Sequence, residues 1–295
     1  MGRSPAAIRR ISLLGAEVDL ITREGVIQRI NELVASQRKA IIANQNLHSL
    51  YLMPRNADMA AFYEMADVIE IDSMPLVYWG RLLGFPTSRA NRCTYLDWRD
   101  QFWRTASDRQ WRVYCLGAPD GVAQVAADRL ASKWRGVTFR AHHGYFDHAA
   151  GSLESQAVID DINAFEPDVI LVGMGMPIQE AWIGRNYAAL VSGVVLSVGA
   201  AFDYEAGLQP PAPRFLGALC LEWAYRLAHQ PRRLFRRYMI EPWSLIAPAM
   251  RDIGRYALKT TPKPVRRDIR FYAARPYPPA AEATSKEDSD LRRAA

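Results

Sequence analysis

Polar side chains follow two strand-like stretches of this sequence and could take part in chemistry. Asn44 and Asn46 come after the apolar stretch Ala40 to Ala43, and Asp72 comes after Val68 to Ile71. Amides both donate and accept hydrogen bonds, and a carboxylate can act as a general base. If the two stretches are parallel strands, their ends meet at one edge of a sheet, where ligands bind. For Asp72 alone, the alternative is that it caps a helix.

A glycine-containing turn after the apolar run from Val169 to Val172 is a candidate anion site. Such a turn, followed by a helix, presents free backbone amides that suit a diphosphate. The residues of the turn and of the following helix are Gly173, Gly175, Pro177, Gln179 and Glu180. The stretch Val194 to Asp203 ends in the same way, and Asp203 lies just beyond its glycine. One such turn occurs in any α/β domain, but two neighbouring ones predict a crevice at the carboxyl edge of the sheet.

A dense set of arginines lies beyond the proline-rich stretch 209–214. They are Arg226, Arg232, Arg233, Arg236 and Arg237. Residues 215–238 are expected to form a helix that is kinked or restarted at Pro231. If that helix runs through, Arg226, Arg233 and Arg237 share one side and can converge on one phosphate. The alternatives are a solvated basic face or, with Trp243 nearby, an amphipathic element at a membrane surface.

Apolar stretches and amphipathic helices alternate along the chain. We expect a short strand pair between Ile11 and Ile21, followed by a helix from Thr22. The later strands are expected at 40–43, 68–71, 113–117, 137–145, 169–172 and from 194, and the later helices at about 46–66, 122–134 and 153–165. This alternation favours right-handed crossovers and an α/β fold with a mainly parallel sheet flanked by helices.

Bulk properties limit the class of protein. The chain has 295 residues, of which 49% are hydrophobic, and a net charge of +6, so a sizeable core and an anionic partner are both expected. Three widely spaced cysteines suggest neither disulfides nor zinc, which makes the cytoplasm the default location. Nowhere do eighteen apolar residues run together, so we expect any membrane contact to be peripheral. We divide the chain into a core (1–214), a helical basic and aromatic appendage (215–255) and a disordered tail (256–295).

Several motifs, in a fixed order, resemble one protein family. They are Asn44-x-Asn46, Ala66-Asp67-Val68 leading to Asp72, Arg92 with Asp97, His143-Gly144-Tyr145-Phe146, Gly173-x-Gly175-x-Pro177-x-Gln179-Glu180, Phe202-Asp203, Glu222-Trp223-x-Tyr225-Arg226, Pro231-x-Arg233 and Arg237-Tyr238. Over roughly residues 11 to 240 the chain is similar to the WecG/TagA/CpsF family of bacterial glycosyltransferases. Ser73 stands where that family usually has glycine, and Asn44 where it usually has threonine.

The resemblance implies transfer of a sugar from a nucleotide sugar, usually a uridine diphosphate sugar, to a polyprenyl-diphosphate-linked acceptor in cell-surface polymer synthesis. It also implies a Rossmann-like core and a C-terminal appendage that works at the inner face of the cell membrane. Asp72 takes the place of the family's proposed catalytic carboxylate. The substrate-binding residues expected on this basis are Asn44, Asn46, Arg92, Gly173, Gly175, Gln179, Glu180, Asp203, Arg226, Arg233, Arg236 and Arg237.

The expected chemistry agrees with the resemblance. An acceptor hydroxyl needs a base, for which Asp72 is suited, and a departing diphosphate needs positive charge, which Arg92 and the C-terminal arginines supply. No Asp-x-Asp pair follows a strand, so we expect metal independence and no cofactor. His142 and His143 are assigned structural or ligand-contact roles rather than metal binding.

Two other classes remain open on the sequence alone. A nucleotide-dependent oxidoreductase could use Gly173 and Gly175, although the full G-x-G-x-x-G pattern is missing. A nucleic-acid-binding protein could use the basic C-terminus, but the polar strand ends would then have no role. We therefore expect no nucleic-acid partner. A homo-oligomer, the sugar transferred and the polymer pathway stay open.

Overall fold

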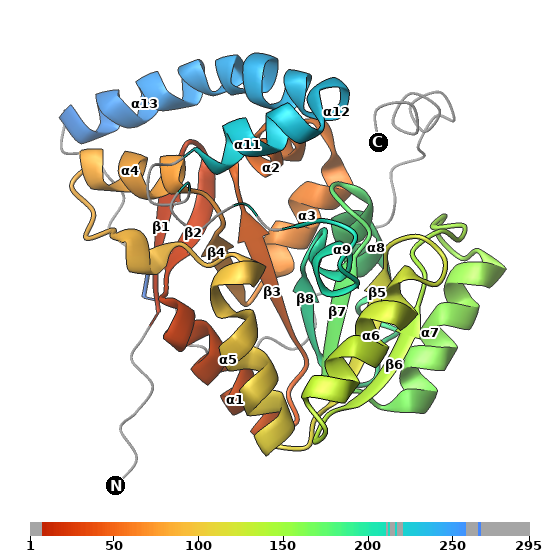
Figure 1. Ribbon diagram of the computed structural model, residues 1–295. Coiled ribbons are helices and arrows are strands. Elements are labelled where there is room, and N and C mark those ends of the chain that lie inside the picture. Colours follow the sequence, from red (N-terminus) through yellow and green to blue (C-terminus); the bar gives the residue numbers. More distant parts are fainter. Residues whose placement is uncertain (1–7, 211, 213–215, 217–220, 258–264, 267–295) are drawn as a thin grey trace, which may run out of the picture.

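The sheet at the centre of the molecule carries the candidate site at one edge. The computed structural model describes residues 8–210, 212, 216, 221–257 and 265–266. Six parallel strands form the sheet in the order β4-β3-β8-β7-β5-β6. Helices cover both faces (Figure 1). The expected Rossmann-like α/β fold with a mainly parallel sheet is thus confirmed.

The strands of this sheet are β3 (Ala40–Gln45), β4 (Val68–Ile71), β5 (Arg112–Gly117), β6 (Thr138–His142), β7 (Val169–Gly173) and β8 (Val194–Ser197). A hairpin of β1 (Arg9–Leu13) and β2 (Ala16–Leu20) precedes them, as expected for 11–21. The hairpin turns at Leu14 and Gly15, which both have positive φ, as a type I′ turn requires.

The helices of the core are α1 (Arg23–Ala35), α2 (Leu47–Leu52), α3 (Ala57–Met65), α4 (Met74–Leu82), α5 (Tyr95–Asp108), α6 (Val122–Lys133), α7 (Leu153–Phe165), α8 (Ile178–Asn186) and α9 (Ala201–Glu205), with short 3₁₀ turns η1 (Met53–Arg55) and η2 (Arg89–Asn91). The single helix expected over 46–66 is wrong. Pro54 lies in η1, and Asn56 caps a new helix, α3, by accepting from the Met59 amide. A proline cannot continue the hydrogen-bond ladder of a helix, which explains the break.

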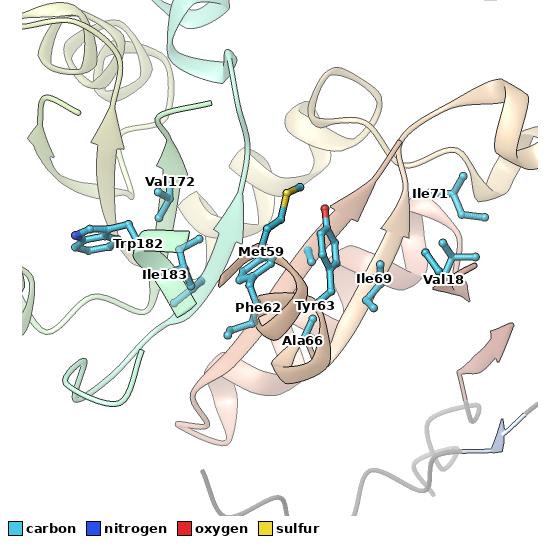
Figure 2. Close-up of a cluster of buried hydrophobic side chains, with 14 of the residues drawn as sticks. Val18, Met59, Phe62, Tyr63, Ala66, Ile69, Ile71, Val172, Trp182 and Ile183 are labelled. Carbon is cyan, nitrogen blue, oxygen red and sulfur yellow. The ribbon is translucent and has the colours of Figure 1, made fainter. Parts of the chain in front are cut away.

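Two hydrophobic cores fill the spaces on either side of the sheet. One contains residues of α2, α3, α7 and α8, and Figure 2 shows part of it, with Met59, Phe62 and Tyr63 near Ile69 and Ile183. The other lies under α1, α5, α6 and α9. Every residue of β7 is buried, as expected for a strand covered on both faces. Packing in these two cores holds the strands in place and thereby sets the positions of their carboxyl ends.

The order of the strands locates a switch point between β7 and β5. From β7 the chain crosses to β8 on one side, whereas from β5 it crosses to β6 on the other. At such a point the connections leave in opposite directions and open a crevice at the carboxyl ends of the strands. The polar residues that follow β3, β4, β7 and β8 all belong to this edge.

Short helices beyond residue 220 lie across this edge of the sheet (Figure 1). They are α11 (Glu222–His229), α12 (Pro231–Phe235), the π-helix η3 (Arg236–Ile240), the 3₁₀ turn η4 (Glu241–Leu245) and α13 (Ile246–Ala257). We call residues 221–257 the appendage. The restart at Pro231 is confirmed. A helix running through to Tyr238 is wrong, because the chain widens into η3 at Arg236.

Two buried carboxylates hold the appendage on the core. Glu241 Oε2 lies 2.6 Å from His48 Nδ1 on α2. Asp252 on α13 accepts from the Leu14 amide at 2.7 Å and from the Trp79 indole at 3.0 Å. Most of the expected disordered tail lies outside the described residues, but Val265–Arg266 form β9, which pairs with β1. No helix in the described part of the chain is long and apolar enough to cross a membrane.

Candidate functional site

Asp72 lies at the carboxyl end of β4 and is held by one amide. Asn46 Nδ2 donates to Asp72 Oδ2 at 3.1 Å. Ser73, not Asp72, is the N-cap residue of α4, so the alternative that Asp72 caps a helix is wrong. Burial raises the pKa of the Asp72 carboxyl to about 6, although Asn46 and three arginines lower it. A carboxylate with this pKa is ionised at neutral pH yet binds a proton readily, as a general base must.

Asn46 is positioned by the first turn of α2. It is the N-cap residue, and its Oδ1 accepts from the amides of His48 and Ser49. Ser49 Oγ accepts in return from the backbone N–H of Asn46 at 2.8 Å, which completes a capping box. Because the oxygen is used by the helix, the nitrogen of the Asn46 side chain has to face Asp72. The expected role of Asn46 as a polar group beside the carboxylate thus has a local cause in the sequence.

Arg226 and Arg237 bring positive charge to Asp72 from the appendage. Both act electrostatically on the Asp72 carboxyl. Burial opposes the charge of Arg226, but Tyr204 and Asp72 raise its pKa, and its guanidinium also donates to the Tyr204 hydroxyl. Burial and the nearby Arg226 lower the pKa of Arg237. Neither arginine forms a salt bridge within the described residues. The two cations therefore both act on the Asp72 carboxylate, and a further anion would balance the second positive charge.

Arg92 joins the segment after α4 to the appendage. Its guanidinium donates to both oxygens of Asp97 at 3.0 Å and to Glu222 Oε2 on α11, also at 3.0 Å. It is buried and acts electrostatically on Asp72. A phosphate would therefore have to replace Glu222 to reach Arg92. The predicted contact between Arg92 and a diphosphate stays a prediction.

Gln179 connects the two glycine turns. Its Oε1 accepts from the amides of Gly175 and Gly199 at 3.2 and 3.3 Å, and its Nε2 donates to Glu180 at 2.7 Å. The Gln179 side chain is 0% exposed. This geometry favours an indirect role, in which Gln179 shapes the turns after β7 and β8. Direct contact with a ligand stays a prediction.

Glu180 is a buried acid beside this network. Burial raises its pKa to about 7, and Oε2 has no hydrogen-bond partner. Its charge also raises the pKa of Tyr63, whose hydroxyl donates to the Asn44 carbonyl at 2.7 Å. Asn44 in turn donates from Nδ2 to the Ser197 carbonyl at 2.6 Å, which joins the end of β3 to the end of β8. The ends of β3, β8 and α8 thus form one polar network.

Four glycines allow the ends of β5, β7 and β8 and the segment after β6 to approach one another closely. A Cβ on Gly117 would lie 2.3 Å from the Gly173 carbonyl oxygen, and one on Gly173 would lie 2.5 Å from that of Gly199. A Cβ on Gly144 would lie 2.9 Å from the Gly117 Cα. We call Gly144, Gly117, Gly173 and Gly199 the glycine floor. Gly175 has a φ of +83°, a conformation that glycine adopts without strain. The bond between Met176 and Pro177 is cis.

Other expected site residues lie apart from Asp72 or are incompletely described. Arg236 is exposed and donates to the Tyr51 hydroxyl at 3.4 Å. The Arg233 side chain lies outside the described residues. Asp203 lies in the first turn of α9, beyond the turn of β8. His142 and His143 stack on each other after β6. No group of three or more His, Cys, Asp or Glu that could hold a metal occurs in the described ranges. Binding roles for these residues stay predictions.

Sequence reasoning missed several contributors to the site. Tyr204 binds Arg226, Glu222 binds Arg92, and Glu70 is buried near Asp72. Tyr204 and Glu222 act through contacts between distant segments, which periodicity does not show. Glu70 did have a signal, because a carboxylate interrupts the otherwise apolar strand Val68 to Ile71.

The chain was compared with known proteins. It matches the Glycosyl transferase WecG/TagA/CpsF family over residues 11–258. It is also similar to proteins of Staphylococcus aureus that are named N-acetylglucosaminyldiphosphoundecaprenol N-acetyl-beta-D-mannosaminyltransferase. Those of strains MW2 and COL are each 29% identical over 237 residues, which cover 77% of this chain and 87% of the relative.

Proposed function

The chain belongs to the WecG/TagA/CpsF family of glycosyltransferases, and on that basis we propose that it transfers a sugar from a uridine diphosphate sugar to a polyprenyl-diphosphate-linked acceptor at the membrane surface. The relatives named above act, by their names, on an undecaprenol-linked diphosphate sugar. A glycosyltransferase with this class of acceptor fits the edge of the sheet described here. An oxidoreductase or a nucleic-acid-binding protein is set aside.

The observation that carries the proposal is the placement of Arg226 and Arg237 beside Asp72. In the proposed reaction, Asp72 accepts the proton of an acceptor hydroxyl while that oxygen attacks the anomeric carbon of the donor. The bond from that carbon to the diphosphate breaks, and the nucleoside diphosphate leaves with the electron pair. The two arginines stabilise the charge that develops on it, in a site where burial strengthens their effect.

The donor diphosphate is proposed to lie over the turns after β7 and β8. Backbone amides near a helix N-terminus suit an anion. Gln179 holds the conformation of both turns by accepting from the amides of Gly175 and Gly199. Gly175 and Gly199 have open space where a Cβ would stand, so a ligand can approach the backbone of both turns closely. Asn44 Nδ2 donates to the Ser197 carbonyl at 2.6 Å and to Ser197 Oγ at the longer distance of 3.4 Å, and an oxygen of the nucleotide sugar can replace this second acceptor.

The appendage is proposed to meet the membrane with an outward apolar stripe. Ile246, Met250 and Ile253 on α13 are exposed and follow each other at intervals of four and three residues. Trp243 just before them is 71% exposed, whereas Asp252 faces the core. A helix with this pattern lies in a membrane interface. An acceptor anchored by a polyprenyl chain would then enter beside Arg226 and Arg237.

A transfer assay with the purified chain tests the reaction. The acceptor is N-acetylglucosamine linked through diphosphate to a short polyprenyl chain, in detergent. The donors are uridine diphosphate forms of N-acetylmannosamine, N-acetylglucosamine, glucose and glucuronic acid. We expect a glycosylated lipid and released uridine diphosphate with one donor of the panel. Turnover should fall at least about 100-fold in Asp72→Asn, the usual scale for loss of a general base. Near-normal turnover in that variant would contradict the role of Asp72.

Liposome co-sedimentation tests the membrane contact. Full-length protein should sediment with anionic vesicles, and Trp243→Ser with Met250→Ser should weaken this binding. Leu153→Ser is a matched control, because Leu153 is exposed but lies on α7. Equal binding of the double variant and the control would contradict the proposed stripe.

A further inference from the structure

Glu70 is a buried acid directly behind Asp72. It lies on β4, two residues before Asp72, and is 4% exposed. Side chains alternate along a strand, so Glu70 projects to the same side as Val68, which packs in the core under α1 and α5. Trp98 of α5 lies next to its carboxyl group and lowers its pKa. An acid in this position is costly unless it is neutral or fully hydrogen-bonded.

Three polar atoms around Glu70 lack a hydrogen-bond partner. They are Glu70 Oε1, Asn44 Oδ1 and Trp98 Nε1. Asn44 and Glu70 are direct register partners in the pairing of β3 with β4. Neighbouring strands are about 5 Å apart, and paired side chains on one face come within reach of each other. The atoms that lack partners therefore lie in one small region, where they can supply hydrogen bonds to one another.

The orientation of the Asn44 amide is fixed from the other side. Nδ2 donates to the carbonyl of Ser197 on β8, and a carbonyl can only accept, so this end of the amide is the nitrogen. Because β3 lies between β8 and β4, an amide whose Nδ2 is bound to β8 leaves its buried Oδ1 free to accept from the β4 side, where Glu70 is the register partner. An ionised Glu70 would present a second acceptor to that oxygen. A neutral Glu70 would present a donor.

The charges around Glu70 favour its neutral form. Burial, and then the nearby Asp72, raise the pKa of Glu70 well above its ordinary value, and Asp97 adds to the effect. Cys93 also faces it, and the Glu70 charge contributes to the raised pKa of the Cys93 thiol. Of the nearby cations, Arg92 is bound to Asp97 and Glu222, and Arg23 acts electrostatically on Cys93. No described cation neutralises Glu70.

We propose that Glu70 is a neutral carboxylic acid whose proton is donated to Asn44 Oδ1, while its other oxygen accepts from Trp98. This makes Glu70 a positioning residue. It locks the Asn44 amide with Nδ2 on Ser197, where the long contact to Oγ at 3.4 Å can be exchanged for one to the donor, and it leaves Asp72 as the only charged acid at the end of β4. The inference rests on the proposed function, because it concerns the donor site and the base of that reaction.

Two substitutions separate this role from simple packing. Glu70→Gln cannot ionise but keeps a donor for Asn44, so it should keep kcat/KM within about threefold of the native value. Glu70→Leu removes the donor and leaves Asn44 Oδ1 unpaired. Its kcat/KM should fall about 10- to 100-fold, mainly through KM for the donor, which is the range expected for an unsatisfied buried group. A loss in Glu70→Gln as large as in Glu70→Leu would overturn the proposal.

The pH dependence gives a readout that packing alone would not change. When Glu70 ionises at high pH, the native protein should lose kcat/KM, and Glu70→Gln should lack this alkaline decline. The folded protein holds the proton that the unfolded chain releases, so its stability should fall as pH rises above about 4.5. Relative to Glu70→Gln, the unfolding constant should rise about tenfold per pH unit until Glu70 ionises in the folded state. A constant ratio between pH 5 and 7 would overturn the proposal.

Infrared spectroscopy detects the proton directly. The difference spectrum of native protein minus Glu70→Gln at pH 7 should contain the carbonyl band of a protonated carboxylic acid. A carboxylate band in its place would refute the inference, even if Glu70→Leu folds poorly. This measurement needs no substrate, so its outcome is separate from that of the Asp72→Asn assay. If Asp72→Asn kept near-normal turnover while Glu70 was found protonated, Asp72 would be refuted as the base. The proposal that Glu70 is a neutral acid would still hold.

Discussion

Replacing Asp72 with asparagine should stabilise the fold while removing the base. The pKa of Asp72 is raised from 3.8 to about 6, so the folded protein binds this proton more tightly than the unfolded chain. Ionisation therefore destabilises the fold, starting above pH 3.8 and reaching its full cost above pH 6. A shift of about 2 pKa units corresponds to about 3 kcal/mol. Because Asp72 is partly accessible, this value is an upper limit.

The measurement is thermal unfolding of both proteins at several pH values. At pH 8, Asp72→Asn should unfold up to about 6 °C higher, since 1 kcal/mol corresponds to about 2 °C in a chain of this size. Asparagine keeps an oxygen for the Asn46 amide, so the hydrogen bond at this position can persist. Below pH 4 the aspartate is protonated in both states, and the advantage of the variant should disappear.

Asp128→Asn is the matched control, because Asp128 is exposed on α6 and contacts Gln124 of the same helix. It should change neither unfolding nor turnover. An Asp72→Asn protein that is no more stable than the native one at pH 8 would refute the reasoning about burial. So would an advantage that does not shrink on acidification. Asp72 would then lower the stability of the fold while it supplies the reactive group, a trade-off between stability and activity that is expected of an enzyme.

Further measurements test other parts of the site. The kcat/KM of the native enzyme should fall about tenfold per pH unit below pH 6, because only ionised Asp72 accepts a proton; a flat acid limb would contradict this. Gln179→Ala should weaken donor binding by about 1 to 3 kcal/mol in calorimetry, since it frees the turns at Gly175 and Gly199; unchanged affinity would place the donor elsewhere. Arg226→Lys should lower kcat about 100-fold in steady-state assays, because a point charge replaces a fork of donors. A chelator should leave turnover unchanged. If the chelator abolished activity and added Mg²⁺ restored it, metal independence would be disproved.

The strands and helices with strong periodicity were predictable from the sequence. Val68–Ile71 and Leu153–Phe165 have the expected bounds, because a short stretch rich in β-branched residues or a clear helical spacing is limited on both sides by polar residues. The site edge followed from these bounds, since the carboxyl ends of parallel strands necessarily meet. Asn46 and Asp72, which belong to neighbouring strand ends, are in contact.

The geometry of the arginines was not predictable in the same way. Arg226, Arg233 and Arg237 would share one side only in a helix that runs through, but Pro231 starts a new helix, as expected, and η3 has a wider turn. Arg226 and Arg237 both reach Asp72 because the appendage docks through Glu241 and Asp252 on the core. Such docking depends on contacts between segments about 200 residues apart. Local patterns in the sequence contain no information about them.

The glycine floor limits how the sugar specificity of this enzyme can be altered. Any side chain on Gly117 or Gly173 would collide with backbone atoms of a neighbouring strand end, and backbone cannot move aside without shifting the sheet. Randomising these positions in a mutant library would therefore yield unfolded proteins rather than new donor preferences. Variation in donor choice has to come from the side chains around the floor, such as Asn44 and Asp203, and from the appendage that covers it. A library built on those positions keeps the place for the diphosphate constant while the place for the sugar changes.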